Sequence, residues 1–100
     1  KCARQECSGV QIHVTDRAAF QPLRWALALI AAAKKISPEG FRWRAEPYEF
    51  VEQVPAVDLL YGSAKFREVV DSGGGLSEIE SDLRIAERWY REQIPSFLLY

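Results

Sequence analysis

Hydrophobic and polar residues alternate in "GVQIHVTD", residues 9–16, where Val10, Ile12 and Val14 share one face. A period of two residues is typical of a β-strand with one buried face. The sequence therefore predicts a first strand here, with the chain's single histidine, His13, on its polar face.

Two further strands are predicted in the middle of the chain. "FRWR", residues 41–44, alternates again and would expose Arg42 and Arg44. Residues 45–63 carry two prolines and read as mostly irregular, with a possible third strand at 57–60. One turn of helix is the alternative for that last segment.

Apolar residues at spacings of three and four predict a long helix over 22–36. Pro22 suits its first turn, because the fixed φ of proline matches a helix and its missing N–H is not needed there. Almost no polar residue interrupts the apolar stripes, so this helix is expected to pack on more than one side. "SPEG", residues 37–40, ends it.

A short helix and a second long helix are predicted in the last third of the chain. Ser63 would cap the short one, which ends at the glycines of "DSGGG", residues 71–75. Ser77 and Glu80 form a capping-box pattern at the start of the long one. Its apolar stripe consists of Ile79, Leu83, Ala86, Tyr90 and Ile94. Pro95 ends this helix, and "SFLLY", residues 96–100, is expected to dock on the core.

These elements predict a single domain of the α+β or α/β class. A small β-sheet would be packed with two long helices and one short helix. A chain of 100 residues buries one modest core, so a second domain is expected only outside it. The start at Lys1 rather than Met leads us to expect a fragment or a processed product.

Composition excludes several classes of function. A formal net charge of -1 argues against a nucleic-acid partner. The longest apolar run, residues 25–33, is shorter than the roughly 20 residues that span a bilayer. No Lys-Ser/Thr pair follows the glycines at 73–75, so they do not form a phosphate-binding loop, and no cofactor is predicted.

The two cysteines, Cys2 and Cys7, do not predict a metal site, because a single histidine and no second cysteine pair accompany them. A disulfide that closes a very small loop is one alternative in an oxidising compartment. The other is two unrelated thiols, with Cys7 packed at the start of the first strand.

The end of the first strand carries the first group of candidate site residues. His13 could act as a general acid or base, or could simply be a hydrogen-bonding surface residue. Asp16 and Arg17 could form a turn and a local ion pair. They could instead present charge at the carboxyl end of a strand, where ligand sites of α/β folds lie.

A second group lies in the irregular segment. Two tyrosines, Tyr48 and Tyr61, occur there among the carboxylates Glu46, Glu49, Glu52 and Asp58. This mixture would suit sugar binding, although charges on a loop can also be merely solvated. The carboxyl separation that a glycosidase needs is not given by a sequence.

The chain as a whole resembles the C-terminal domain of the bacterial exo-β-N-acetylmuramidase family. The similarity runs in order through "CSGVQIHVTDRAAFQP", "ALALIAA", "FRWRAEPYEF", "AVDLLYGSAKFREVVDSG" and the terminal "LLY". Its most specific parts are "GVQIHVTDR" and "DLLYGS", because each places unusual polar residues in an apolar frame.

The resemblance implies an accessory domain of a two-domain hydrolase that releases N-acetylmuramic acid from peptidoglycan fragments. The catalytic carboxylate would lie in a Rossmann-like domain upstream of this chain, so no catalytic residue is assigned here and the isolated chain is expected to be inactive. The residues expected at the sugar cleft or the domain interface are His13, Asp16, Arg17, Tyr48, Asp58, Tyr61 and Ser63. An extracytoplasmic location is favoured over the cytoplasm.

Two other functions stay open at this point. The same surface could bind glycan or dock a subunit without any hydrolysis, as an interaction module. Alternatively, the chain itself could be an enzyme built around His13 and Asp16. The sequence upstream of Lys1 would separate the hydrolase from the interaction module.

Overall fold

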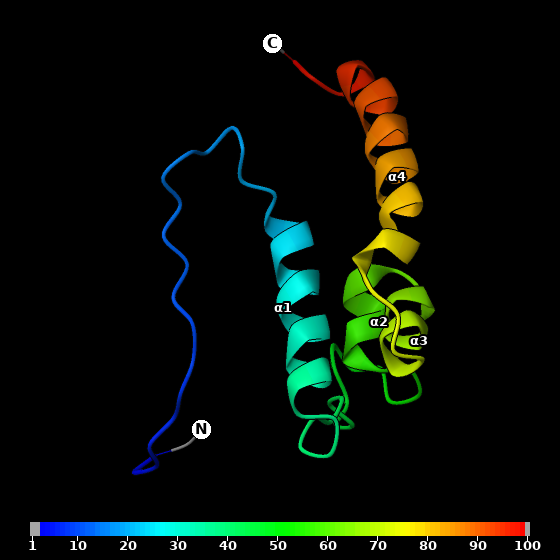
Figure 1. Ribbon diagram of the computed structural model, residues 1–100. Helices are drawn as coiled ribbons and strands as arrows, with labels where there is room; N and C mark the ends of the chain where they lie inside the picture. The colour runs from blue at the N-terminus through cyan, green and yellow to red at the C-terminus, as the bar shows by residue number, and fades with distance from the viewer. Residues whose placement is uncertain (1–2, 100) are drawn as a thin grey trace.

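The computed structural model describes residues 3–99 and consists of helices joined by extended segments (Figure 1). An extended segment, residues 5–14, precedes the first helix. The helical elements follow in the order α1 (Pro22–Ile36), α2 (Ala56–Tyr61), α3 (Lys65–Asp71), the 3-10 turn η1 (Leu76–Glu78), α4 (Glu80–Gln93) and the 3-10 turn η2 (Ile94–Ser96).

A small core lies between α1, α3 and the start of α4. Its buried residues are Leu27 of α1, Phe66 and Val70 of α3, and Ile79 immediately before α4. Phe66 and Val70 share one face because they are four residues apart. Phe66 and Ile79 are the largest fully buried side chains among the described residues, so they mark the centre of this core.

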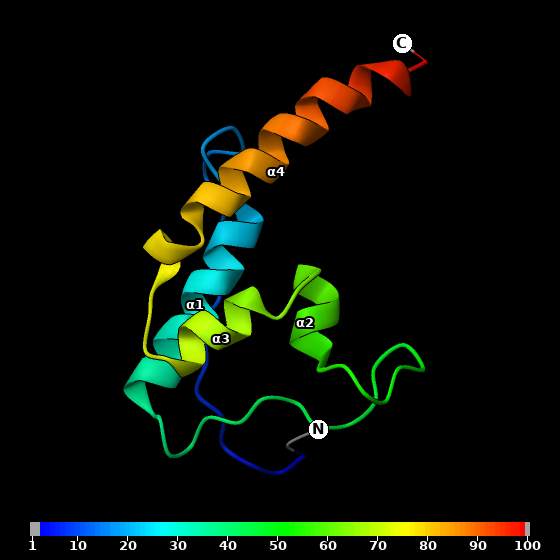
Figure 2. The ribbon, with the colours of Figure 1, turned by 90° about the vertical axis from the view of Figure 1, so that its right-hand side faces the viewer.

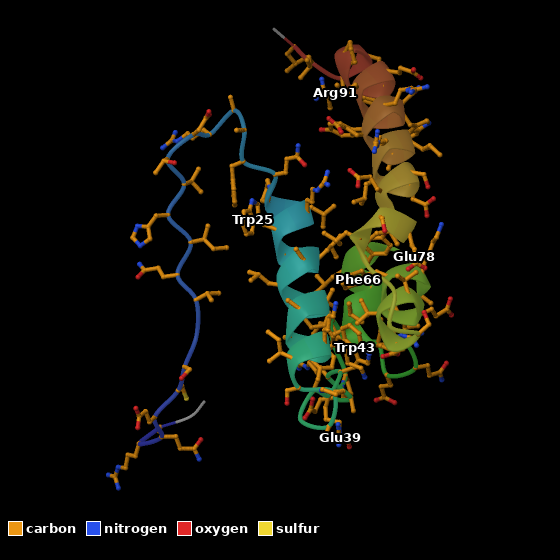
Figure 3. The ribbon with its side chains drawn as sticks, in the orientation of Figure 1. Trp25, Glu39, Trp43, Phe66, Glu78 and Arg91 are labelled. Atoms are coloured by element: carbon orange, nitrogen blue, oxygen red, sulfur yellow. The ribbon has the colours of Figure 1, made fainter. Side chains whose placement is uncertain are left out.

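Trp43 attaches the segment between α1 and α2 to the core. Its ring packs edge-on against Phe66, with the ring centroids 6.3 Å apart, and against Phe41 at 4.8 Å. The indole Nε1–H donates a hydrogen bond to Asp71 at the end of α3, at 2.8 Å. Figure 3 shows Trp43 and Phe66 together beside α1.

Within residues 3–99, the ion pairs that join the last helix to α1 and α3 lie in its first turn. Ion pairs join Arg24 of α1 to Glu80, and Lys65 of α3 to Asp82. Beyond these contacts α4 projects from the body of the molecule (Figure 2). The Cα radius of gyration is 16.4 Å, above the roughly 13 Å expected for a compact chain of this length.

The prediction of a small β-sheet was wrong. Within residues 3–99 the structure contains helices and one isolated β-bridge, between Tyr48 and Val51. The alternating residues 10–14 are extended and solvent-exposed, without a partner strand in this part of the chain. Residues 41–44 are extended too, but Trp43 fixes them through side-chain packing. The molecule is therefore helical rather than α+β or α/β.

The third predicted strand, at 57–60, is part of α2. Pro55 precedes that helix, and Gly62 ends it with a positive φ of 90°, where its N–H bonds to the carbonyl oxygen of Asp58. The helical alternative for this segment is thus the correct one. An extended strand would have needed a neighbour, whereas a helix satisfies its backbone locally.

Helix α1 has the predicted bounds, 22–36, but it buries only one side. Leu27 is its single buried residue, whereas Trp25 and Ile36 are 52% and 83% exposed.

The two side-chain caps predicted for the later helices are not the ones observed. Ala64 rather than Ser63 is the N-cap of α3. Near α4 the capping contact is a hydrogen bond from the Gly75 N–H to Glu78, at 3.1 Å.

The described part of the C-terminal tail, residues 96–99, does not dock on the core as predicted, and Tyr100 lies outside the described residues. Phe97, Leu98 and Leu99 are exposed, because α4 carries them away from the other helices.

Cys7 is exposed in the extended segment rather than packed at a strand. Cys2 lies outside the described residues. No helix in the part of the chain that the structure describes is long and apolar enough to cross a membrane.

Candidate functional site

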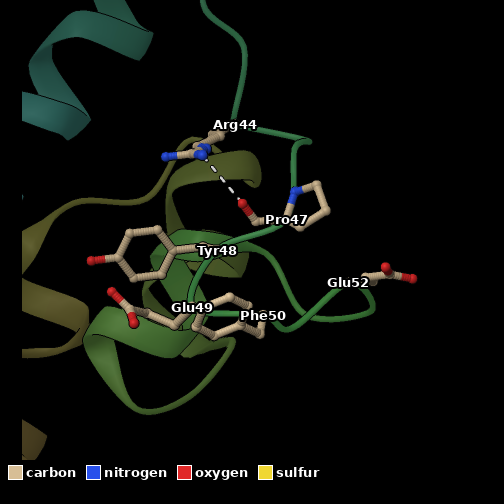
Figure 4. Close-up of a pocket in the computed structure, with 6 residues that line it drawn as sticks. All are labelled: Arg44, Pro47, Tyr48, Glu49, Phe50 and Glu52. Carbon is tan, nitrogen blue, oxygen red and sulfur yellow. Dashed lines mark hydrogen bonds between the residues drawn. The ribbon is translucent and has the colours of Figure 1, made fainter.

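A pocket of about 600 Å³ is formed by the loop at residues 44–52. Its lining residues, shown in Figure 4, are Arg44, Pro47, Tyr48, Glu49, Phe50 and Glu52. The pocket thus combines one guanidinium, two carboxylates and two aromatic rings. The pocket is open to solvent, and aromatic rings with a few polar groups are residue types that small-molecule sites also use.

A tight two-residue turn shapes this loop. Tyr48 and Val51 exchange two backbone hydrogen bonds, of 3.2 and 2.9 Å. Between them Glu49 and Phe50 both have positive φ, of 49° and 66°. Asn and Gly are the usual residues in such turns, because other side chains are strained there. The turn leaves Phe50 fully exposed at its tip.

Arg44 is held in place by the same loop. Its guanidinium lies 5.6 Å from the centre of the Tyr48 ring, and its Nη2 donates a hydrogen bond to the carbonyl oxygen of Pro47 at 3.1 Å. Glu46 lies 3.7 Å from its Nε. The side chain is still about half exposed, so it has donors free for an incoming carboxylate.

Arg44 also borders a second, apolar groove of about 370 Å³ between α1 and α2. Leu27 and Ile30 of α1 line this groove with Trp43 and Tyr61. Arg44 thus lines both the polar pocket and the apolar groove.

Tyr61 and Arg67 are the two described groups with clear pKa shifts. Burial raises the pKa of the Tyr61 phenol above its ordinary 10.0, the charge of Asp82 adds to the rise, and Lys65 opposes it. The hydrogen bond to Asp58 raises the pKa of the Arg67 guanidinium.

The predicted site residues fall into separate groups. Tyr48 lines the pocket, whereas Asp58 is only 6% exposed and is paired with Arg67 inside the fold. Tyr61 packs against the Phe66 ring at 5.7 Å, and Ser63 is exposed just after α2. Asp58 is therefore part of the internal packing, while Tyr48 is accessible.

The other predicted residues, His13, Asp16 and Arg17, lie in and just after the extended segment. The Asp16 carboxylate accepts hydrogen bonds from the N–H groups of Ala18 and Ala19, at 2.9 and 3.2 Å. Its main contact is thus a local turn. Within residues 3–99 no hydrogen bond or ion pair joins this group to the 44–52 loop.

Arg44 and Phe50 are not among the site residues that the sequence predicts. The pattern of residues 41–44 predicts Arg44 on the exposed face of a strand, and it gives no role to Phe50. A signal was present, since an arginine four residues before a tyrosine, with Pro47 between them, can turn back over the ring. Within the described residues no group of three or more potential metal ligands is present.

A family model described as exo-beta-N-acetylmuramidase NamZ, C-terminal, matches residues 1–100, which is the whole chain. No curated protein and no solved structure matches the chain significantly.

Proposed function

The chain belongs to the family of C-terminal domains of the exo-β-N-acetylmuramidase NamZ, and from this membership we propose that it forms one wall of a sugar-binding cleft. The family name identifies a peptidoglycan hydrolase with an additional N-terminal part. In our proposal that N-terminal part carries the catalytic carboxylate, and this domain contributes binding contacts. The parent would release N-acetylmuramic acid outside the cytoplasm.

The Arg44 pocket is the observation that supports this function best. N-acetylmuramic acid carries a carboxyl group on its lactyl ether, and a guanidinium pairs well with a carboxylate. The rings of Tyr48 and Phe50 offer apolar faces to a sugar ring. Glu49 and Glu52 can accept hydrogen bonds from sugar hydroxyls. We assign these residues to binding rather than to bond cleavage.

This assignment predicts a defect in substrate binding when the charge of Arg44 is removed. In the full-length parent, Arg44→Gln should raise KM for a chromogenic N-acetylmuramic acid glycoside about tenfold and leave kcat nearly unchanged, which corresponds to about 1.4 kcal/mol. Arg91→Gln, at the far end of α4 (Figure 3), is the matched control. Unchanged kinetics of Arg44→Gln would contradict the assignment.

The isolated 100-residue chain should not release N-acetylmuramic acid in the same assay. Turnover by the purified chain would show that its own residues, such as His13 and Asp16, perform the chemistry. This experiment separates an accessory domain from an enzyme that is complete in itself.

The interaction module, which docks a subunit or binds glycan without hydrolysis, has separate support. Helix α4 exposes Ile85, Trp89 and Tyr90, and the tail exposes Phe97 and Leu99. Exposed apolar surfaces of this kind are typical of protein interfaces. A full-length parent that binds peptidoglycan but releases no sugar would favour this second function.

A further inference from the structure

The segment that leads into α1 is extended, and within residues 3–99 no strand is paired with it. Residues 5–14 are extended, and no backbone hydrogen bond of the described residues involves positions 5–15. Figure 1 shows this segment in blue to one side of the helices. Each residue there offers an N–H and a C=O group, as an edge strand does.

Its side chains have the pattern of a strand as well. Val10, Ile12 and Val14 are 74%, 46% and 45% exposed and lie at alternate positions. All three are β-branched, which favours an extended backbone. A strand with one apolar face is stabilised when that face is covered and its backbone is paired. Neither condition is met within residues 3–99.

The end of this segment is well defined. The turn closed by the Asp16 carboxylate redirects the chain, and Pro22 then begins α1. The extended segment is therefore separated from α1 by a formed turn, rather than being a frayed helix end. Gly9 lies inside the segment, where an added Cβ would meet nothing within 4 Å.

We propose that residues 9–15 add as a β-strand to a sheet edge in the N-terminal part of the parent protein. The occupant must be an extended chain, because a helix has no row of free N–H and C=O groups to offer. The partner strand would come from the N-terminal part of the parent, because this chain matches the C-terminal domain of its family. The extended segment precedes α1, so it is the described segment nearest in sequence to that N-terminal part. The proposal rests on family membership and backbone geometry, independently of the sugar pocket.

Amide hydrogen exchange tests this pairing directly. In the full-length parent, amides within residues 9–15 should exchange about 100-fold more slowly than in the isolated chain, at all positions or at alternate ones. Amides of α1 and α3 report that the helical body is folded in both samples. Exchange of 9–15 at the unprotected rate in the parent would overturn the proposal.

Protection of residues 9–15 in the isolated chain would also overturn it. If protection there depended on concentration, the partner would be a second copy of the chain; if it did not, the pairing would be internal. A size measurement of the isolated chain distinguishes these two results. Both results are independent of sugar release, so they leave the proposed function to be judged separately.

A pair of variants tests the face of the strand. In the parent, Ile12→Ser should lower the protection of residues 9–15 about tenfold, because it removes an apolar side chain from the covered face. Gln11→Ser, on the opposite face, is the matched control and should retain the protection. Equal protection in the two variants would contradict the proposed interface.

Discussion

The carboxylate of Asp58 accepts three hydrogen bonds from the guanidinium of Arg67. The Nε group lies 2.9 and 3.0 Å from the two carboxylate oxygens, and Nη2 lies 2.8 Å from Oδ2. Asp58 is on α2 and Arg67 is on α3, helices of six and seven residues. Helices this short are not stable alone, so this pair and the core contacts hold them together.

Removal of the Asp58 charge should destabilise the fold. In Asp58→Asn the amide nitrogen faces the donors of Arg67, and we expect the free energy of unfolding to fall by about 1.5–3 kcal/mol. Urea denaturation followed by circular dichroism measures the change. Glu87→Gln, in the exposed pair with Arg91 on α4, is the control and should have no measurable effect. Equal stabilities of the two variants would contradict a structural role for the buried pair.

Truncation of Phe66 should cost much more stability than truncation of Tyr90. Phe66 is 1% exposed and Tyr90 is 57% exposed. Phe66→Ala should lower the free energy of unfolding by about 3–5 kcal/mol, whereas Tyr90→Ala should change it by less than about 0.5 kcal/mol. Thermal or urea unfolding of the isolated chain checks both values. A large effect of Tyr90→Ala would mean that the second half of α4 packs on the core in solution.

Deprotonation of Tyr61 should lower the free energy of unfolding at alkaline pH. Because burial and Asp82 raise the pKa of its phenol, the folded state holds that proton more tightly than the unfolded state. The stability that depends on this proton is fully present below pH 10.0, and it is lost as the pH rises through the folded-state pKa of Tyr61. Urea unfolding at pH 9 and pH 11 should therefore show a smaller loss for Tyr61→Phe than for the natural chain. Tyr90→Phe, at an exposed position, is the control, and an equal loss in Tyr61→Phe and the natural chain would contradict the prediction.

Substitution of Phe50 by glycine should separate stability from activity. Phe50 has a φ of 66°, where glycine is not strained, so Phe50→Gly should raise the free energy of unfolding by up to about 1 kcal/mol. In the full-length parent the same change removes an aromatic face from the pocket and should lower kcat/KM. A Phe50→Gly parent with unchanged kcat/KM would show that the ring does not contact the sugar.

The sequence by itself determined the helices whose stabilising contacts are local. Pro22 and the apolar spacing placed α1 at 22–36, and the last long helix was recognised from its stripe. These predictions succeeded because helical hydrogen bonds join residues four apart, so both partners lie in the same short window. The family resemblance came from the sequence too, and the match over residues 1–100 confirms it.

The tertiary structure decided everything that depends on a distant partner. Alternation in residues 10–14 shows which side chains share a face, but not whether a neighbouring strand exists. The stripe of α4 likewise does not tell where the core ends, and only Ile79 at its start is fully buried. Asp58 is predicted at the sugar cleft from the sequence, but in the structure its carboxylate pairs with Arg67, nine residues away. Strand pairing, burial and ion pairing are contacts between separate segments, and a local pattern does not specify which segments meet.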